Sequence, residues 1–118
     1  MGSLGSVEVD RLERLDGRAF DGQKLRRAGT WAVAFLAEWC PFCHAFAPGF
    51  AGLGHGSNLA VGDLTDYESP LWDVFGVDVV PTVLVFRDGE IVFRANGILG
   101  EGLGPQDLAA VRRALARP

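Results

Sequence analysis

The pattern of hydrophobic and polar positions divides the chain into short strands and helices. Residues 31–37 are continuously apolar and end at a turn, which is typical of a strand buried on both faces of a sheet. Residues 59–64 and 82–86 are further apolar strand candidates. Residues 91–95 are predicted to form the second strand of a hairpin with 82–86, because an Asp-Gly turn joins them. A short stretch of alternating apolar and polar residues at 12–15 is the first strand candidate in the chain.

Helical patterns separate and follow these strands. Gly29 is expected to end the first helix, and Pro48 to interrupt the second. In the last helix Leu108, Val111 and Leu115 recur at helical spacing and form its apolar side. The predicted helices are residues 20–28, 40–50, 70–75 and 105–116.

The order of these elements, β-α-β-α-β-α-β-β-α, predicts an α/β fold with a central mixed β-sheet flanked by helices. The length of 118 residues suits one domain. We expect a flexible N-terminal segment at residues 1–10 and a single domain at residues 11–118.

Charge and hydropathy then exclude several classes of partner. Lys and Arg number 11 against 15 Asp and Glu, for a net charge of −4, and no basic cluster indicates nucleic-acid binding. No apolar run is long enough to span a bilayer, so no membrane partner is expected. Residues 1–6 do not resemble a signal peptide, so we predict a cytoplasmic protein. We also expect it to be a monomer.

The candidate chemistry lies in the only two cysteines, Cys40 and Cys43. A structural disulfide framework would use more cysteines at wider spacing, so this pair fits redox chemistry in a reducing compartment. Cys40 follows the buried strand and opens a helix, where unpaired N–H groups and the helix dipole favour a thiolate. Cys43 lies one turn further on, close enough to form a disulfide with Cys40.

Three other interpretations of the two cysteines stay open at this point. Both thiols could be small core residues. The string from Cys40 to His44 also reads C-x-x-C-H, the haem-attachment pattern, but the only methionine is Met1 and the only other histidine is His55. Zinc needs four ligands, and His44 and His55 would supply the last two at poor spacing. We therefore predict no metal and no cofactor beyond a redox-active Cys40–Cys43 disulfide.

Several motifs together resemble the thioredoxin family. Residues 35–48 are similar to its active-site segment, including Trp39 before the first cysteine and Pro48 after the second. Val80-Pro81-Thr82 resembles the family's cis-proline loop, and Gly97 stands where the family has a glycine near the site. The resemblance extends from about residue 20 to residue 118.

This resemblance implies a thioredoxin fold and a protein-disulfide oxidoreductase, with Cys40 and Cys43 catalytic. It implies a cis Pro81 against the cysteines, although a proline at a strand start is an ordinary alternative. The expected partners are protein disulfides and an upstream reductase or small thiol. A redox sensor, or a binding domain with one dedicated partner, is the alternative. The expected substrate-binding residues are Trp39, Pro41, Phe42, Val80, Pro81, Thr82 and Gly97.

The chain also departs from the family pattern. Pro41-Phe42 replaces the usual Gly-Pro, and Ala34 stands where the family has a buried aspartate. Gly62 replaces the lysine that pairs with that acid, so the neighbouring Asp63, or water, is the expected proton acceptor for Cys43. The segment after Pro48 is short, which predicts a truncated helix. The changed dipeptide and the missing acid predict a reduction potential more oxidising than the roughly −270 mV of thioredoxin.

Overall fold

A five-stranded sheet organises the chain in the computed structural model, which describes residues 2–54 and 57–117. His55, considered above as a possible ligand, lies outside the described residues. The elements in chain order are α1 (Val7–Asp10), β1 (Glu13–Leu15), the 3₁₀ turn η1 (Gly17–Ala19), β2 (Phe20–Asp21), β3 (Lys24–Leu25), β4 (Thr30–Leu36), α2 (Pro41–Ala51), β5 (Asn58–Asp63), α3 (Leu71–Val74), β6 (Thr82–Arg87), β7 (Glu90–Ala95) and α4 (Pro105–Ala116).

The strands follow the order β1-β5-β4-β6-β7. β5 pairs parallel with both β1 and β4, whereas β6 pairs antiparallel with both β4 and β7. β4 lies at the centre, with Ala34 opposite Val61 on one side and Val83 on the other. The mixed sheet is therefore confirmed, and the continuous apolar run in β4 reflects burial on both faces.

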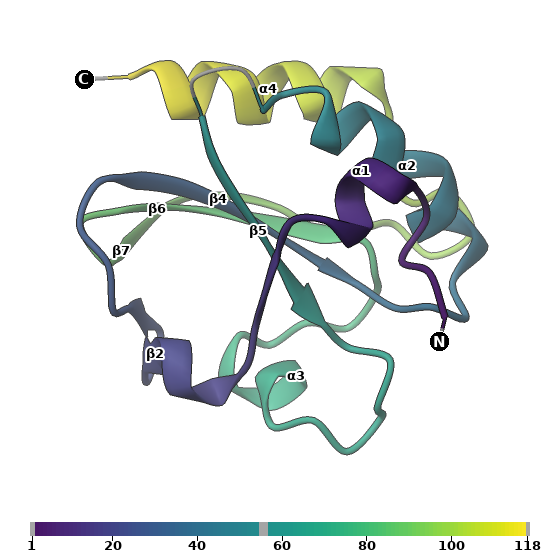
Figure 1. Cartoon of the computed structure of the whole chain (residues 1–118), viewed down its shortest axis with the longest axis horizontal. Helices are drawn as coiled ribbons and strands as arrows, with labels where there is room; N and C mark the ends of the chain where they lie inside the picture. The colour runs from purple at the N-terminus through teal and green to yellow at the C-terminus, as the bar shows by residue number, and fades with distance from the viewer. Residues whose placement is uncertain (1, 55–56, 118) are drawn as a thin grey trace.

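Helices α1, α2 and α4 lie on one face of this sheet, and α3 lies with the β2 region on the other (Figure 1). The α3 face encloses an aromatic cluster, in which the rings of Phe20 and Phe75 are 4.9 Å apart and those of Phe35 and Phe75 are 5.3 Å apart. Apart from the first helix, the predicted elements agree with the observed ones within one or two residues. α2 ends at Ala51, soon after Pro48, as the truncation prediction expected.

The predicted helix at residues 20–28 is wrong. β2 and β3 form a small antiparallel hairpin there, with Phe20 opposite Leu25 and both side chains buried. Gly22 makes the turn at a φ of 58°, a conformation that glycine adopts without steric cost. The Leu25 N–H donates to the Gly89 carbonyl at 3.0 Å, so contact with the distant β6–β7 turn stabilises the hairpin.

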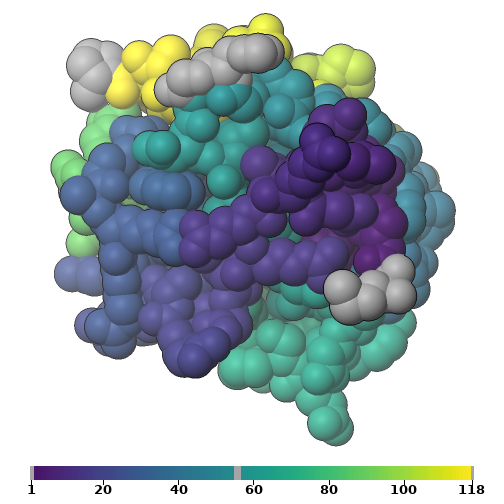
Figure 2. Space-filling view, in the orientation of Figure 1, coloured from purple at the N-terminus to yellow at the C-terminus, as the bar shows by residue number. Residues whose placement is uncertain are grey.

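The N-terminal segment differs from the expected flexible stretch, although Met1 lies outside the described residues. Leu4 and Val9 are fully buried, and Ser6 caps α1 by accepting the Val9 N–H. A Cβ atom at Gly5 would lie 2.5 Å from the Ala47 Cβ of α2, so the backbone packs directly on that helix. Figure 2 shows this segment (purple) lying on the surface beside α2. Burial of two apolar side chains against α2 explains why residues 2–10 join the domain.

No helix in the described ranges is both long and apolar enough to cross a membrane.

Candidate active site

Cys40 is the N-cap residue of α2, where the chain turns out of the central strand β4. Its Sγ accepts the backbone N–H of Cys43 at 3.2 Å, and Pro41 occupies the first turn, where no N–H donor is needed. The sulfur therefore faces the amide end of the helix, where a negative charge is stabilised. Only 4% of Cys40 is exposed, so a substrate reaches it through a narrow opening.

Cys43 lies one turn into α2 and is completely buried. Burial raises the pKa of the Cys43 thiol well above its ordinary range, and the hydrogen bond with the Cys40 thiol raises it further. Both cysteines are free thiols in this structure. The two sulfurs thus differ in access, and Cys43 stays protonated at neutral pH while the site is reduced.

The loop before β6 closes the site from the other side. The Val80–Pro81 peptide bond is cis, as the family resemblance implied. The Cys40 Sγ lies 3.5 Å from the Val80 carbonyl oxygen and donates to it in the thiol form. The two segments that carry the sequence motifs are therefore in contact, although 40 residues separate Cys40 from Val80.

Thr82 and Gly97 hold this loop in place. The Thr82 Oγ1 donates to the Val79 carbonyl at 2.7 Å and accepts the Gly97 N–H at 3.2 Å. A Cβ atom at Gly97 would lie 2.3 Å from the Pro81 carbonyl oxygen, a distance that excludes any other residue without a backbone shift. Of the predicted site residues, Thr82 and Gly97 thus support the loop that lies against Cys40.

An aromatic stack flanks the cysteines. The Trp39 Nε1 donates to the Thr65 carbonyl at 2.9 Å, which fixes the indole ring beside the site. The Tyr67 ring stacks on it at 4.9 Å between centroids, and the Trp72 ring lies parallel at 6.4 Å. The sequence analysis singled out Trp39 but not Tyr67 or Trp72. Tyr67 lies in the loop after β5, for which the sequence gives no local pattern. Trp72 lies on α3, a helix that the sequence predicts without indicating that it lies beside the cysteines.

A pocket of about 210 Å³ opens beside Cys40. Phe42, 39% exposed, forms part of its wall together with residues from three other segments of the chain. The lining residues are Trp39, Cys40, Pro41, Phe42, Trp72, Asp78, Val79, Val80, Leu99 and Gly100. Of the sequence-predicted site residues, Trp39, Cys40, Pro41, Phe42 and Val80 line this pocket. Pro81 and Thr82 continue the loop from Val80, Gly97 packs against that loop, and Cys43 lies deeper in α2.

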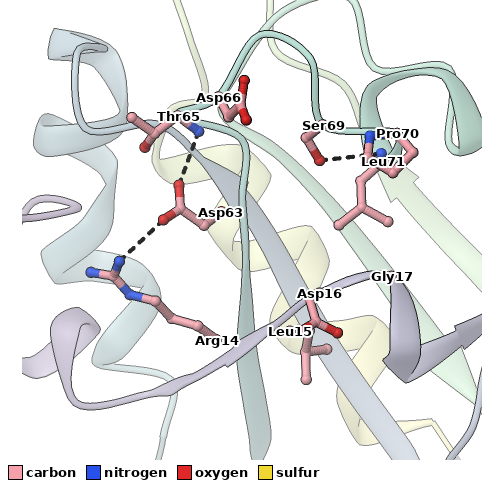
Figure 3. A pocket seen from close by; sticks show the side chains of 10 residues that line it. All are labelled: Arg14, Leu15, Asp16, Gly17, Asp63, Thr65, Asp66, Ser69, Pro70 and Leu71. Carbon is pink, nitrogen blue, oxygen red and sulfur yellow. Dashed lines mark hydrogen bonds and ion pairs between the residues drawn. The ribbon is translucent and has the colours of Figure 1, made fainter.

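Asp63 does not take the place of the buried aspartate that the family has at the position of Ala34. The Asp63 carboxylate pairs with Arg14 at 3.1 Å and accepts the Thr65 N–H at 2.9 Å (Figure 3). The pocket around Asp63 has a volume of about 520 Å³, and its lining residues, drawn in Figure 3, include neither cysteine. The expectation that Asp63 takes the proton of Cys43 is therefore wrong, because both of its oxygens are directed to other partners.

Apolar groups fill the positions of the family's acid–lysine pair. Ala34 is fully buried in β4, and a Cβ atom at Gly62 would lie 2.5 Å from the Phe35 ring. The Phe35 ring thus occupies the space that the first side-chain atom of any larger residue at position 62 would need. Water at the pocket is the remaining candidate for proton transfer from Cys43.

The described residues contain no group of three or more His, Cys, Asp or Glu side chains arranged to hold a metal ion. The His44 Nε2 lies 2.7 Å from the Glu38 carbonyl oxygen, so this ring nitrogen is engaged with the backbone that precedes Cys40. His44 therefore braces the turn between β4 and α2.

Comparisons with known proteins agree with this site. The thioredoxin family model matches residues 12–104, and the chain belongs to the thioredoxin family, whose members act as thiol–disulfide oxidoreductases. A thioredoxin from Rhodospirillum rubrum is 29% identical over 91 residues, covering 75% of this chain and 88% of that protein. A thioredoxin from Chlamydia caviae is 32% identical over 73 residues, covering 59% of this chain and 71% of its own.

Solved structures show the same fold. Chlamydomonas reinhardtii thioredoxin f2 superimposes with a TM-score of 0.72 at 19% identity, covering 91% of this chain and 98% of that one. The thioredoxin fold expected from the sequence is thus confirmed.

Proposed function

We propose that the protein reduces protein disulfides through the Cys40–Cys43 dithiol. The observation that carries this proposal is the contact of the Cys40 sulfur with the N-terminal amides of α2 on one side and the Val80–Pro81 loop on the other. This arrangement places the attacking sulfur at the amide end of a helix and beside a backbone segment that a substrate can pair with as an added strand.

The proposed reaction has two exchange steps. The Cys40 thiolate attacks one sulfur of the substrate disulfide, forms a mixed disulfide and releases the other substrate sulfur as a thiolate, which water protonates. Cys43 then loses its proton and attacks the Cys40 sulfur, which forms the Cys40–Cys43 disulfide and releases the second substrate thiol. Two electrons pass to the substrate, and a small dithiol or an upstream reductase returns them. The proposal needs no metal and no cofactor.

We expect the reduction potential of this protein to be less negative than that of thioredoxin, which is about −270 mV. Ala34 leaves Cys43 without a buried carboxylate, and Pro41-Phe42 replaces the family's dipeptide. Titration against glutathione buffers, followed by Trp39 fluorescence, measures this value. A potential at or below about −270 mV contradicts the expectation. The compartment that we propose is the cytoplasm, since the only cysteines form a redox pair rather than a structural framework.

Turnover tests the function itself. With excess dithiothreitol the protein should reduce insulin disulfides through many cycles, whereas a redox sensor would be oxidised or reduced once per molecule. The matched control is Cys40→Ser, which removes the attacking sulfur and leaves the rest of the pocket in place. Reduction no faster than in that control would overturn the proposed activity.

A further inference from the structure

Charge is distributed unevenly around the proposed active site. Residues 28–86 contain both cysteines and no lysine or arginine. Among the carboxylates of this stretch that the structure describes, Asp63 has an ion-pair partner, Arg14, and no other one does. Negative charge without a neighbouring cation therefore gathers in this part of the molecule. The carboxylates of the stretch are Glu38, Asp63, Asp66, Glu68, Asp73 and Asp78.

Exposed acids border the aromatic stack and the pocket. Asp66 and Glu68 flank Tyr67 in the chain, and the Asp66 carbonyl accepts the Trp72 Nε1–H at 3.1 Å. Asp78 lines the pocket itself and has no side-chain hydrogen bond within the described ranges. Arg94 is the next cation along the chain after Arg87, and its guanidinium is directed to the carbonyls of Phe75 and Gly76. An incoming cation would therefore meet Asp78 at the pocket and Asp66 and Glu68 beside Tyr67, none of which has an ion-pair partner in the described ranges.

A tight turn forms the apolar wall of the same pocket. The Ile98 N–H donates to the Gly102 carbonyl at 3.2 Å, and the Gly102 N–H donates to the Ile98 carbonyl at 2.8 Å. Gly102 has a φ of 72°, and a Cβ atom there would lie 2.8 Å from the Phe42 Cβ. The turn is thus seated on Phe42 and presents Leu99, 84% exposed, at the opening.

The size of the pocket indicates what enters it. Its volume of about 210 Å³ is below the ~300 Å³ at which small-molecule and cofactor sites usually begin. One apolar side chain of a polypeptide fits this space better than a cofactor. Its walls of Phe42, Trp72 and Leu99 match such a side chain, and Asp78 at the rim matches a neighbouring cation.

Resting on the proposed function, we infer that the protein selects disulfides whose reactive cysteine is flanked by a bulky apolar residue and by Lys or Arg. The apolar side chain enters the pocket between Phe42 and Leu99, and the cation faces Asp78 and the acids beside Tyr67. Attraction between opposite charges speeds encounter and orients the substrate, and salt screens it.

Two matched peptide disulfides test this selection. Each is a symmetrical dimer of a short peptide with Leu before the cysteine, followed by Lys in one peptide and by Glu in the other. Reduced protein is mixed with each peptide, and the second-order rate constant is measured at about 0.01 M and about 1 M salt, where the Debye length is about 30 Å and 3 Å. We expect the Lys peptide to react roughly tenfold faster at low salt, with most of the difference lost at high salt.

Variants separate a local effect from net charge. Asp78→Asn should lower the preference for the Lys peptide about threefold at low salt. Glu8→Gln removes the same charge from an exposed position on α1 and should leave the preference unchanged. Leu99→Ala should lower the rate constants for both peptide disulfides. It should not lower the rate constant for a third peptide in which Gly replaces the Leu before the cysteine.

The outcomes distinguish the inference from the function on which it rests. If both peptides react at the same rate, or if Glu8→Gln lowers the preference as much as Asp78→Asn, the inference is overturned and the reductase activity stands. If neither peptide reacts and insulin is not reduced, the proposed function fails and the inference fails with it.

Discussion

The two sides of the redox site differ in almost every physical respect. Beside Cys40 the surface is open and aromatic, with Trp39 43% exposed and Tyr67 73% exposed. Around Cys43 the structure is closed, and Gly5 of the N-terminal segment packs against the backbone of α2 near it. The proposed mechanism assigns different roles to these two thiols of one helical turn: Cys40 attacks the substrate, and Cys43 stays buried and protonated until the mixed disulfide forms.

The largest effects should come from the two sulfurs themselves. Cys40→Ser is expected to abolish disulfide reduction, because the first exchange step needs the Cys40 sulfur. Cys43→Ser is expected to lower turnover on the order of 10³-fold, because only the second step, which releases the substrate, needs Cys43. The two variants should differ in what accumulates. Cys43→Ser should form a stable mixed disulfide with the substrate, visible by intact-protein mass spectrometry, whereas Cys40→Ser should form none. A mixed disulfide through Cys43 would reverse the assignment of the two roles.

The closed side is tested by removing an apolar anchor of the N-terminal segment. Leu4 is fully buried, so Leu4→Ala should lower the free energy of unfolding by roughly 2–5 kcal/mol. Val7, 61% exposed on the same segment, provides the matched control, and Val7→Ala should change stability by less than about 0.5 kcal/mol. Urea denaturation of the reduced protein measures both. Equal stability of the two variants would place residues 2–10 outside the core.

The raised pKa of Cys43 also predicts how stability depends on pH. The unfolded thiol titrates near the ordinary value of 9.0, whereas burial raises the pKa of the folded thiol above it. Above pH 9.0 the unfolded chain therefore loses a proton that the folded protein keeps, so this contribution to stability is complete below that pH and declines as the pH rises.

The measurement is urea denaturation of the reduced protein at several pH values on either side of that value. Cys43→Ala is the control, since it removes this thiol and keeps the other titrating groups. The wild type should lose more stability than the variant over the alkaline range. Parallel pH profiles would mean that Cys43 is as accessible to water in the folded protein as in the unfolded chain.

Local motifs explain which features of the Cys40 and Cys43 surroundings could be predicted from the sequence. The helix start at Cys40 depends on a few adjacent residues, so the local sequence was sufficient for it, whereas the cis Pro81 loop was implied by the family resemblance. The contact between them followed from the family resemblance rather than from any periodicity.

The parts that sequence analysis missed depend on contacts between distant segments. Leu25 joins a hairpin because its N–H reaches Gly89, and no pattern within residues 20–28 reports that contact. Leu4 is buried in a segment whose Gly5 backbone packs on α2, far along the chain. Asp63 follows the buried part of β5, and only the folded structure brings it to Arg14. The hydrophobic pattern thus predicted the sheet. The packing of the N-terminal segment on α2 beside Cys43 could be seen only in the tertiary structure.

The smallest effect should come from the outer ring of the aromatic stack on the open side. Tyr67 stacks on Trp39 at an angle of 13° between the ring planes, and exposed pairs of this kind contribute about 0.5–1.5 kcal/mol. The hydrogen bond from the Trp39 Nε1 to the Thr65 carbonyl does not involve Tyr67. Tyr67→Ala should therefore lower stability by no more than about 1.5 kcal/mol and change the Trp fluorescence of the reduced protein.

The kinetic consequence of Tyr67→Ala separates a substrate surface from a structural brace. If the stack contacts substrate, the rate constant for a protein disulfide should fall about threefold, while that for a small uncharged disulfide should not change. Val92→Ala, at a 44% exposed position on β7, is the matched control for loss of an exposed apolar group. An equal loss with both disulfides would mean that Tyr67 acts through the position of Trp39 and Cys40. The open side would then serve to orient the thiol rather than to receive the protein substrate.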